Sequence, residues 1–564
     1  MSDLITMMSA AAGQVTGGGY QISRSLRFNS ADSAYLSRTP GTTGDRKTWT
    51  WSGWIKRTSL LNANFQTVIT ADSGSNPDRL YFGRSGTNDF LLIASIGDTY
   101  VLVTTQVFRD PSSWYHLVWA VDTTQATDIN RAKLYVNGVQ ITAFNSSSYP
   151  TLDYLTEFNL ASRLNRIGAR SDASDLLDGY LTEVNFIDGQ ALTPSSFGET
   201  NATTGVWSPI RYAGSYGTNG FYLNFSDNTS TTTLGEDQAG SNDWTLNNFS
   251  VTAGAGNDSL VDTPTPYGTD TGAGGEVRGN YATLNAVSIS TGLPYVSISN
   301  GNLGVAGTSA VNDGVVPATV SAKTGKYYWE YTSAAYSAGG YSRIGIMPIE
   351  GVFGTNGYLG GFANSCGYDP TGTLVKTGGN TTSWGATWGA TDVIGVALDC
   401  DNGAVYFSKN GVFQNSGVPT SGASKTGAAI TWTGGTIDMY PICDMYQTTS
   451  SGDMNFGQRP FAYTAPSGFK ALVTTNLAEG TITTSGTFTG NGSADGPFVY
   501  LNGVPTAMTI DGNAVTFGTH ADKLANGFKV RSSSATYNAN ATSMPYTIST
   551  TGAKFKFANA QSNP

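Results

Sequence analysis

Polar and apolar residues alternate with a period of two along the patterned stretches of this chain. Residues 48–52 read Thr-Trp-Thr-Trp-Ser, and residues 326–331 read Lys-Tyr-Tyr-Trp-Glu-Tyr. Apolar runs at 114–121 and 392–399 have the length of buried strands. The pattern therefore predicts an all-β protein built from tandem β-sandwiches.

Three of the expected strands end in Asn-Gly, the dipeptide that best fits a tight hairpin turn. The pairs are Asn137-Gly138, Asn410-Gly411 and Asn502-Gly503. This is how β-meanders ordinarily turn, so the recurrence does not indicate homologous repeats.

Stretches rich in Gly, Ser, Thr and Pro divide the chain into predicted domains. The linker is placed at Asp262-Thr-Pro-Thr-Pro266 and its flanks. The expected parts are a docking or tail segment at 1–20, a first sandwich at 21–252, a linker at 253–278, a second sandwich at 279–474 and a small C-terminal β module at 475–564.

Composition supports the β assignment. Charged residues make up 12% of the chain, against a usual share of about 25%. Glycine accounts for 70 of the 564 residues. A helical bundle would need far more Glu, Lys, Ala and Leu at a helical period.

Charge and residue counts exclude several function classes. The net charge is −10 and there is no basic run, which disfavours nucleic-acid binding. The sequence lacks an apolar run of about 18 residues, so we expect no membrane insertion. His116 and His520 are the only histidines, too few for a His-rich metal site. The cysteines are expected to be buried free thiols of a chain folded in a reducing cytosol: Cys366, Cys400 and Cys443.

Residues 24–200 resemble the laminin-G-like, concanavalin A-type jelly roll. The residues that carry the resemblance are Ser25-Leu-Arg-Phe28, Tyr35-Leu36, Trp49-Thr-Trp-Ser-Gly-Trp-Ile55, Trp114-Tyr-His-Leu117, Leu134-Tyr-Val-Asn-Gly138 and Asp178-Gly-Tyr-Leu-Thr-Glu-Val184.

Residues 279–474 resemble a SPRY domain, another β-sandwich, whose usual activity is protein binding. The matching motifs are Gly325-Lys-Tyr-Tyr-Trp-Glu330, Arg343-Ile-Gly-Ile346, Asp392-Val-Ile-Gly-Val-Ala-Leu-Asp399, Phe407-Ser-Lys-Asn-Gly411 and Asn455-Phe-Gly-Gln458.

The combination of the two domains, with Phe186-Ile-Asp-Gly-Gln190 and the short leader, resembles tailed-phage virion proteins. The resemblance implies a tail fibre or receptor-binding protein of the virion, homotrimeric, attached to other virion proteins through residues 1–20. Its partner would be a glycan or protein of the host surface. Residues 1–17 lack the features of a signal peptide, so synthesis in the host cytoplasm is expected.

An enzymatic alternative arises because concanavalin A-like folds also include glycanases. Such enzymes need two carboxylates about 5–9 Å apart, and the usual Glu-x-Asp spacings are absent. Glu183 stands alone, and Glu236-Asp237 would face opposite ways in a strand. Asp399 and Asp401 precede an Asn-Gly turn and are interpreted as structural. We therefore expect a non-enzyme.

Metal and sugar sites were the remaining candidates. Asp237, Asn242 and Asp243 offer oxygens for Ca²⁺ but are also good turn formers, and the turn is favoured. No other cofactor is expected. For ligand binding, Trp384 and Trp388 in a Gly-rich stretch are the candidate residues.

Other aromatic residues are weaker candidates for ligand sites. Tyr212, Tyr216 and Tyr222 form a similar cluster in the sequence. Structural roles are expected for His116 and for the tryptophans Trp49, Trp51, Trp54, Trp114 and Trp119.

The favoured function is host attachment by several weak contacts on a rigid β scaffold. Alternatives left open are a capsid or tail decoration protein without a receptor role, a glycan-depolymerising tailspike and a cellular adhesin.

Overall fold

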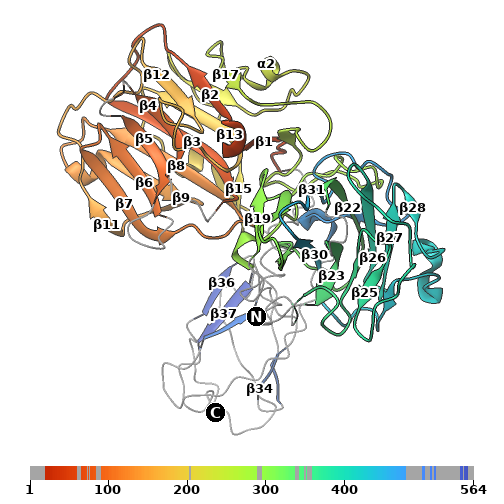
Figure 1. Ribbon diagram of the computed structural model, residues 1–564. Coiled ribbons are helices and arrows are strands. Elements are labelled where there is room, and N and C mark those ends of the chain that lie inside the picture. Colours follow the sequence, from red (N-terminus) through yellow and green to blue (C-terminus); the bar gives the residue numbers. More distant parts are fainter. Residues whose placement is uncertain are drawn as a thin grey trace. The chain divides into compact units, whose positions relative to one another are not determined.

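The computed structural model describes residues 19–477, except 60–64, 73, 75–76, 84–90, 202–204, 289–294, 337–341, 349–350 and 352–357, together with five short strands between residues 498 and 556 (Figure 1). The chain divides into two compact units. The first unit contains residues 1–199 and 209–478, and the second contains residues 200–208 and 479–564.

The first sandwich lies within the first unit and consists of two antiparallel sheets. One sheet has the strand order β10-β9-β8-β3-β13-β1-β18, and β16 also pairs with β13. Its strands are β1 (Ser25–Phe28), β3 (Thr48–Arg57), β8 (Trp114–Asp122), β9 (Ala132–Val136), β10 (Val139–Gln140), β13 (Gly179–Asp188), β16 (Phe221–Leu223) and β18 (Ser259–Leu260).

The facing sheet has the order β11-β7-β6-β5-β4-β12-β2-β17. Its strands are β2 (Tyr35–Arg38), β4 (Gln66–Asp72), β5 (Asp78–Gly83), β6 (Leu91–Ile96), β7 (Tyr100–Val107), β11 (Phe144–Ser147), β12 (Leu164–Ile167) and β17 (Thr245–Asn247). Strands β14 (Gly198–Thr200) and β15 (Trp207–Pro209) lie outside these two sheets.

Aromatic residues on alternate positions fill the space between the two sheets. Trp49 and Trp51 project from the same face of β3 into the core, and the ring of Trp49 meets that of Trp119 edge to face at 4.8 Å. Trp54 and Trp114 are buried as well, which confirms the packing role expected for all five tryptophans. The polar residues between them, Thr50 and Ser52, point to the opposite face of the sheet.

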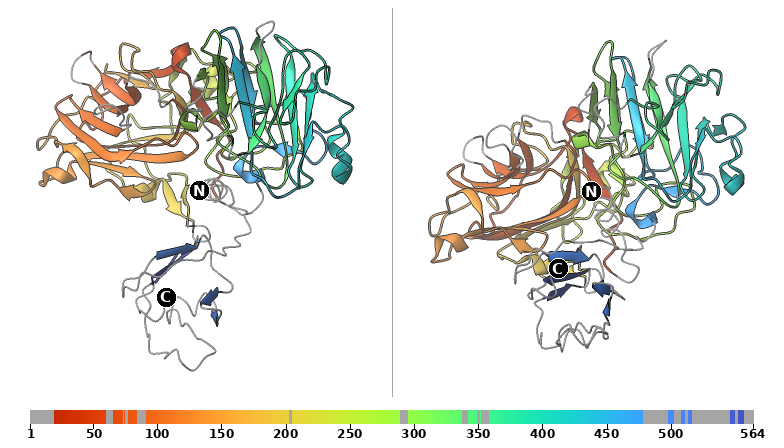
Figure 2. Two further views of the ribbon diagram at one scale, coloured as in Figure 1. Left: turned by 60° about the horizontal axis from the view of Figure 1, so that its bottom comes forward. Right: turned by 90° about the horizontal axis from the view of Figure 1, so that it is seen from below.

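The second sandwich, coloured green to blue in Figure 2, also belongs to the first unit. Its larger sheet has the order β19-β20-β31-β22-β26-β27-β28, with β29 on β27 and β32 on β22. These strands are β19 (Val296–Ser299), β20 (Gly304–Gly307), β22 (Lys326–Ala335), β26 (Val393–Asp399), β27 (Ala404–Lys409), β28 (Val412–Phe413), β29 (Ile430–Thr431), β31 (Ser451–Asn455) and β32 (Lys470–Ala471).

The smaller sheet has the order β21-β30-β23-β24-β25. Its strands are β21 (Asp313–Pro317), β23 (Arg343–Pro348), β24 (Cys366–Tyr368), β25 (Leu374–Lys376) and β30 (Met439–Tyr446). Cys366 and Cys443 lie in these strands, and with Cys400 they are buried and free, as expected.

Two of the predicted Asn-Gly turns are confirmed. Val136 pairs with Val139 across Asn137-Gly138, and Lys409 pairs with Val412 across Asn410-Gly411. All four turn residues have positive φ, between 48° and 82°, as a type I′ turn requires. The third pair, Asn502-Gly503, lies outside the described residues.

Residues 253–278, expected to be a linker, are packed along both sandwiches. Strand β18 pairs with β1, with Leu26 opposite Ser259, and Leu260, Asp262 and Val277 are buried. Apolar and paired residues interrupt the Gly- and Pro-rich composition here, and they hold the segment in place.

Helical structure is sparse among the described residues. A short α-helix, α2 (Thr231–Leu234), begins at a capping box on Ser230. The 3₁₀ turns are η1 (Ser30–Asp32), η2 (Asp128–Asn130), η3 (Pro194–Ser196), η4 (Ala286–Ser288), η5 (Pro419–Ser424) and η6 (Thr474–Asn476). No helix in the described part of the chain is long and apolar enough to cross a bilayer.

The second unit is described only through its strands. They are β33 (Phe498–Leu501), β34 (Met508–Ile510), β35 (Asn513–Val515), β36 (Tyr546–Ser549) and β37 (Gly552–Lys556). Strand β37 pairs with both β33 and β36, and β34 pairs with β35. At the other end, residues 1–18 of the expected docking segment lie outside the described residues.

Candidate functional site

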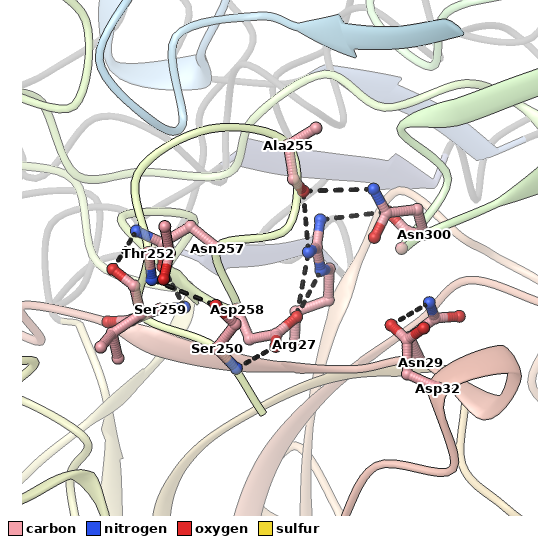
Figure 3. Close-up of polar contacts among 12 residues, drawn as sticks. Arg27, Asn29, Asp32, Ser250, Thr252, Ala255, Asn257, Asp258, Ser259 and Asn300 are labelled. Carbon is pink, nitrogen blue, oxygen red and sulfur yellow. Dashed lines mark hydrogen bonds and ion pairs between the residues drawn. The ribbon is translucent and has the colours of Figure 1, made fainter. Parts of the chain in front are cut away.

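Arg27 connects the two sandwiches. It alternates along β1 with the core residues Leu26 and Phe28 and therefore leaves the opposite face of the sheet. Its Nε and Nη2 donate to Asp258 Oδ1 at 3.1 and 2.9 Å. Nη1 reaches the carbonyl oxygen of Asn300 in the second sandwich at 3.4 Å (Figure 3). The buried ion pair with Asp258 thus positions the guanidinium, and the hydrogen bond to Asn300 joins the two sandwiches.

The turn between β19 and β20 makes further contacts with the first sandwich. The Tyr180 hydroxyl donates to the Gly301 carbonyl at 2.6 Å, and Asn302 Nδ2 donates to the Thr58 carbonyl at 2.9 Å. Asn300, Gly301 and Asn302 all have positive φ, so the turn itself has a fixed, tightly curved backbone. These bonds hold the two sandwiches in one arrangement.

A cleft of about 240 Å³ opens beside this turn. Its walls carry amide, hydroxyl and carboxylate groups, and none of the lining residues is aromatic. The lining residues are Asn29, Ser30, Ala31, Thr58, Ser59 and Asp178 of the first sandwich and Ile298, Ser299, Asn300, Gly301 and Asn302 of the second. The volume is below the about 300–1,000 Å³ that holds a drug-sized ligand, so a single sugar ring is a suitable occupant.

The carboxylate in the cleft has a defined position. Asp178 accepts hydrogen bonds from the backbone N–H and the hydroxyl of Ser30, both at 2.8 Å. Asn29 caps the short turn that follows β1. Because local hydrogen bonds orient these groups, a ligand would meet a preorganised polar surface.

Trp384 and Trp388, the candidate ligand residues from the sequence, do not offer exposed rings. Their exposed fractions are 8% and 3%. Both pack around Tyr368, with ring centres 5.4 and 6.3 Å away. The Gly-rich stretch that holds both tryptophans packs against β24, where the Tyr368 hydroxyl donates to the Ala386 carbonyl. Neither Trp384 nor Trp388 therefore offers a sugar a free ring face on which to stack.

The tyrosines that clustered in the sequence do come together in the structure. Tyr216 stands edge to face with Tyr212 at 5.1 Å and lies nearly parallel to Tyr222 at 6.4 Å. The exposed Arg211 places its guanidinium 4.8 Å from the centre of the Tyr222 ring.

Glu183 lies beneath this tyrosine cluster, and the sequence reasoning missed its role. It occupies a bulge in β13 with φ of 54° and accepts from the Tyr222 hydroxyl at 2.8 Å. That hydroxyl also bonds to the Tyr20 hydroxyl at 2.6 Å. Burial raises the pKa of Glu183 to about 7. The available signal was a lone Glu in the middle of a strand whose residues are all buried.

The proposed calcium loop is built as a turn. Asp237 accepts from the backbone N–H groups of Tyr222, Ala239 and Asn242, at 2.8, 2.9 and 3.0 Å. Asp243 in turn accepts from the Asp237 N–H. The carboxylates thus hold backbone donors, in agreement with the favoured turn interpretation. Within the described residues, no three His, Cys, Asp or Glu side chains are grouped as a metal site requires.

The acids weighed as a glycanase pair have structural partners. Asp399 accepts from the backbone and side-chain N–H groups of Asn402 and forms an ion pair with Lys326 at 3.1 Å. Asp401 accepts from the Gly325 N–H at 2.7 Å. Both carboxylates therefore stabilise the β26–β27 turn, as the sequence indicated.

His116 has the structural environment that was expected. Its Nε2 lies 2.8 Å from the Ser52 hydroxyl, and its ring stacks on Trp54. Burial lowers its pKa to about 3, so the imidazole is neutral at physiological pH.

Comparison with protein families identifies both sandwiches. Residues 29–197 match the Laminin_G_3 model of the concanavalin A-like lectin/glucanases superfamily, and residues 326–459 match the SPRY domain model. The chain therefore contains a concanavalin A-like domain followed by a SPRY domain.

Solved structures show corresponding similarities. The SPRY domain of human HERC1 is 16% identical over 30% of this chain and 96% of its own, with a TM-score of 0.24. A candidate carbohydrate binding protein from Bacteroides ovatus is 17% identical over 40% of this chain, with a TM-score of 0.28, and the match spans 59% of its length. The heptameric SAP-like pentraxin of Limulus polyphemus is 16% identical over 31% of this chain and 80% of its own, with a TM-score of 0.24.

Proposed function

We propose that this chain is a non-enzymatic attachment protein of a phage particle and that the cleft between its two sandwiches binds a glycan of the host surface. The observation that carries the binding proposal is the polar lining of the cleft, with Asn29, Asp178 and Asn302 on opposite walls. The particle assignment is supported by the resemblance of the combined domains to virion proteins.

The chemistry of the cleft suits a ligand rich in hydroxyl groups. Each sugar hydroxyl donates one hydrogen bond and accepts others, and the cleft offers both amide donors and carboxylate or carbonyl acceptors. Arg27 and Tyr180 fix the walls through bonds across the junction. A rigid site loses little conformational entropy on binding.

The cleft favours binding over hydrolysis. Asp178 is the one carboxylate among its described lining residues, whereas a glycosidase needs two that flank the scissile bond. A single shallow polar site typically binds weakly, with about 4 kcal/mol at millimolar Kd. Several copies in a homotrimer on one particle can raise avidity by roughly 10²–10⁴.

Occlusion of the cleft tests the binding proposal. Ala31 is exposed and lines the cleft, so Ala31→Trp should fill it without removing a hydrogen bond. Ala126 is exposed and lies outside it, so Ala126→Trp is the matched control. Against purified host-surface polysaccharide, we expect Ala31→Trp to weaken binding about tenfold or more, a loss of roughly 1.4 kcal/mol. Equal binding by the two variants would refute the cleft as the site.

Particle experiments test the attachment proposal. The free protein should block adsorption of particles to host cells, and deletion of residues 1–20 should prevent incorporation into particles. Normal incorporation of the truncated chain would remove the docking role of that segment. Release of reducing ends from the polysaccharide would replace the non-enzymatic proposal with a depolymerase.

A further inference from the structure

Lys56 is a fully buried cation whose three hydrogen-bond donors meet three different oxygens. It lies on β3, on the face opposite the aromatic core, and its side chain has no exposed area. Nζ is 2.8 Å from Asp262 Oδ2, 2.8 Å from Asn280 Oδ1 and 3.0 Å from the Tyr281 carbonyl oxygen. An amine, a carboxyl group and a primary amide thus share one buried site.

Aromatic side chains enclose this group. Trp114 Nε1 donates to Asp262 Oδ1 at 3.2 Å, and the Tyr180 ring centre lies 5.7 Å from Nζ. Tyr180 and Tyr281 are buried as well. Removal of a carboxylate from water is costly, which favours the protonated form of the Asp262 carboxyl group. Burial correspondingly raises the pKa of Asp262.

We propose that Lys56 Nζ and Asn280 Cγ form an intramolecular amide bond, with the Asp262 carboxyl group carrying the protons. The site has the three groups that transamidation needs: a nucleophile, an electrophilic carbonyl and a proton carrier. Asp262 and Asn280 both lie within hydrogen-bond reach of Lys56 Nζ, so the reaction occurs within a folded chain without a bimolecular encounter.

The reaction balances within these three side chains. The Lys56 ammonium gives one proton to the Asp262 carboxylate, which leaves a neutral amine and a carboxylic acid. The amine lone pair forms a bond to Asn280 Cγ, while a second proton passes from the attacking nitrogen through Asp262 to Nδ2. The Cγ–Nδ2 bond then breaks and ammonia leaves. Asp262 remains as the neutral acid, and no oxidant, reductant or cofactor is consumed.

The positions of the three groups favour Asn280 over Asp262 as the electrophile. Asp262 Oδ1 is held by Trp114 and Oδ2 by Lys56 itself, an arrangement that suits a proton carrier. Direct condensation of Lys56 with Asp262 would release water and leave no second acid hydrogen-bonded to Nζ to carry protons.

The bond would link two parts of the first unit. Lys56 belongs to the first sandwich, while Asn280 lies where the chain enters the second and is 224 positions away in sequence. Tyr281 forms a bridge to Val473 near the end of that sandwich. The cross-link would therefore prevent the sandwiches from separating under load, whether or not the cleft binds a glycan.

Intact mass of the full chain tests the proposal. Wild-type protein, purified and denatured, should be lighter than its sequence predicts by one molecule of ammonia, and tryptic digestion should yield one peptide pair joined through Lys56 and Asn280. A wild-type mass equal to the sequence mass would overturn the proposal. A loss of water instead would overturn the assignment to Asn280.

Variants distinguish formation of this amide bond from other reactions that release ammonia. Lys56→Arg keeps the charge but removes the primary amine, so its mass should match its sequence, as should that of Asn280→Ala. Asp262→Asn should also keep its full mass because the proton carrier is gone. The same loss in Lys56→Arg would assign it to another reaction, such as cyclisation of an Asn, and would refute the cross-link. Because the wild-type measurement is decisive alone, a variant that fails to fold leaves the test intact.

Discussion

Asp262 and Glu183 are both acids buried against the first sandwich, but different groups replace the water around them. Asp262 faces the Lys56 ammonium in a closed aromatic site. Glu183 has hydroxyl donors, and the nearest guanidinium in its cluster, Arg211, is exposed. A directly paired cation offsets the cost of burying charge, whereas neutral donors offset it only in part. The first acid is therefore held against the amine of the proposed cross-link, and the second is suited to titration near neutral pH.

Removal of the cation from Asp262 should produce the largest effect. Lys56→Met leaves Asp262 buried without the amine beside it and also cannot form the proposed cross-link, and we expect the free energy of unfolding to fall by about 3–5 kcal/mol or more. Urea unfolding at neutral pH measures this loss. The matched control is Lys47→Met, since Lys47 pairs with Asp153 at the surface, where both side chains contact solvent, and there the loss should be at most about 1 kcal/mol. Similar losses in both variants would contradict the distinction.

Neutralisation of Glu183 should change the pH dependence of stability. Its pKa is about 7 in the folded chain and 4.5 ordinarily, so the folded state binds the extra proton. The stability that this proton confers is complete below about pH 4.5 and is lost as pH rises through 7. Glu183→Gln removes that loss, so relative to wild type the variant should gain about 2–3 kcal/mol between pH 5 and pH 8.

Thermal unfolding of wild type and Glu183→Gln at both pH values measures this gain. Glu157→Gln serves as the control because Glu157 is a partly exposed acid that forms a salt bridge with Arg163 outside the tyrosine cluster. A constant difference between Glu183→Gln and wild type at the two pH values would show that Glu183 stays charged throughout.

Substitution of Arg27 should have an effect of intermediate size. Lysine keeps the positive charge but not the hydrogen-bond geometry of the guanidinium. Lysine at this position cannot reach Asp258, Ala255 and Asn300 at once, as the guanidinium does. Arg27→Lys should cost about 1.5–3 kcal/mol, and limited proteolysis should cleave between the sandwiches sooner than in wild type. Unchanged cleavage would show that other contacts suffice to hold the junction.

The smallest expected effect concerns Asp237, a third buried acid, which is satisfied by backbone donors. Because three N–H groups already occupy its oxygens, addition or chelation of Ca²⁺ should leave the melting temperature unchanged. A rise in Tm on titration with Ca²⁺, abolished by Asp237→Asn, would show that the loop rearranges to bind metal.

The functional groups that lie between distant segments were harder to predict from the sequence than the fold was. Lys56 is one of the polar residues that alternate with the apolar positions of β3, the pattern of a solvent-facing side chain. Its partners, Asp262 and Asn280, are 206 and 224 positions away. Trp384 and Trp388 show the reverse situation, because their rings lie in a Gly-rich stretch of the sequence but are covered by Tyr368 and its neighbours.

The amino-acid sequence by itself determined the local structure of this protein. The period of two placed tryptophans on the inner face of β3, and Asn-Gly pairs set two hairpins, because both depend on residues a few positions apart. Only the tertiary structure decided how the outer face of the first sandwich is used. Arg27, Lys56 and Glu183 acquire their partners from segments distant along the chain, and the free energy of a buried charge depends on those partners.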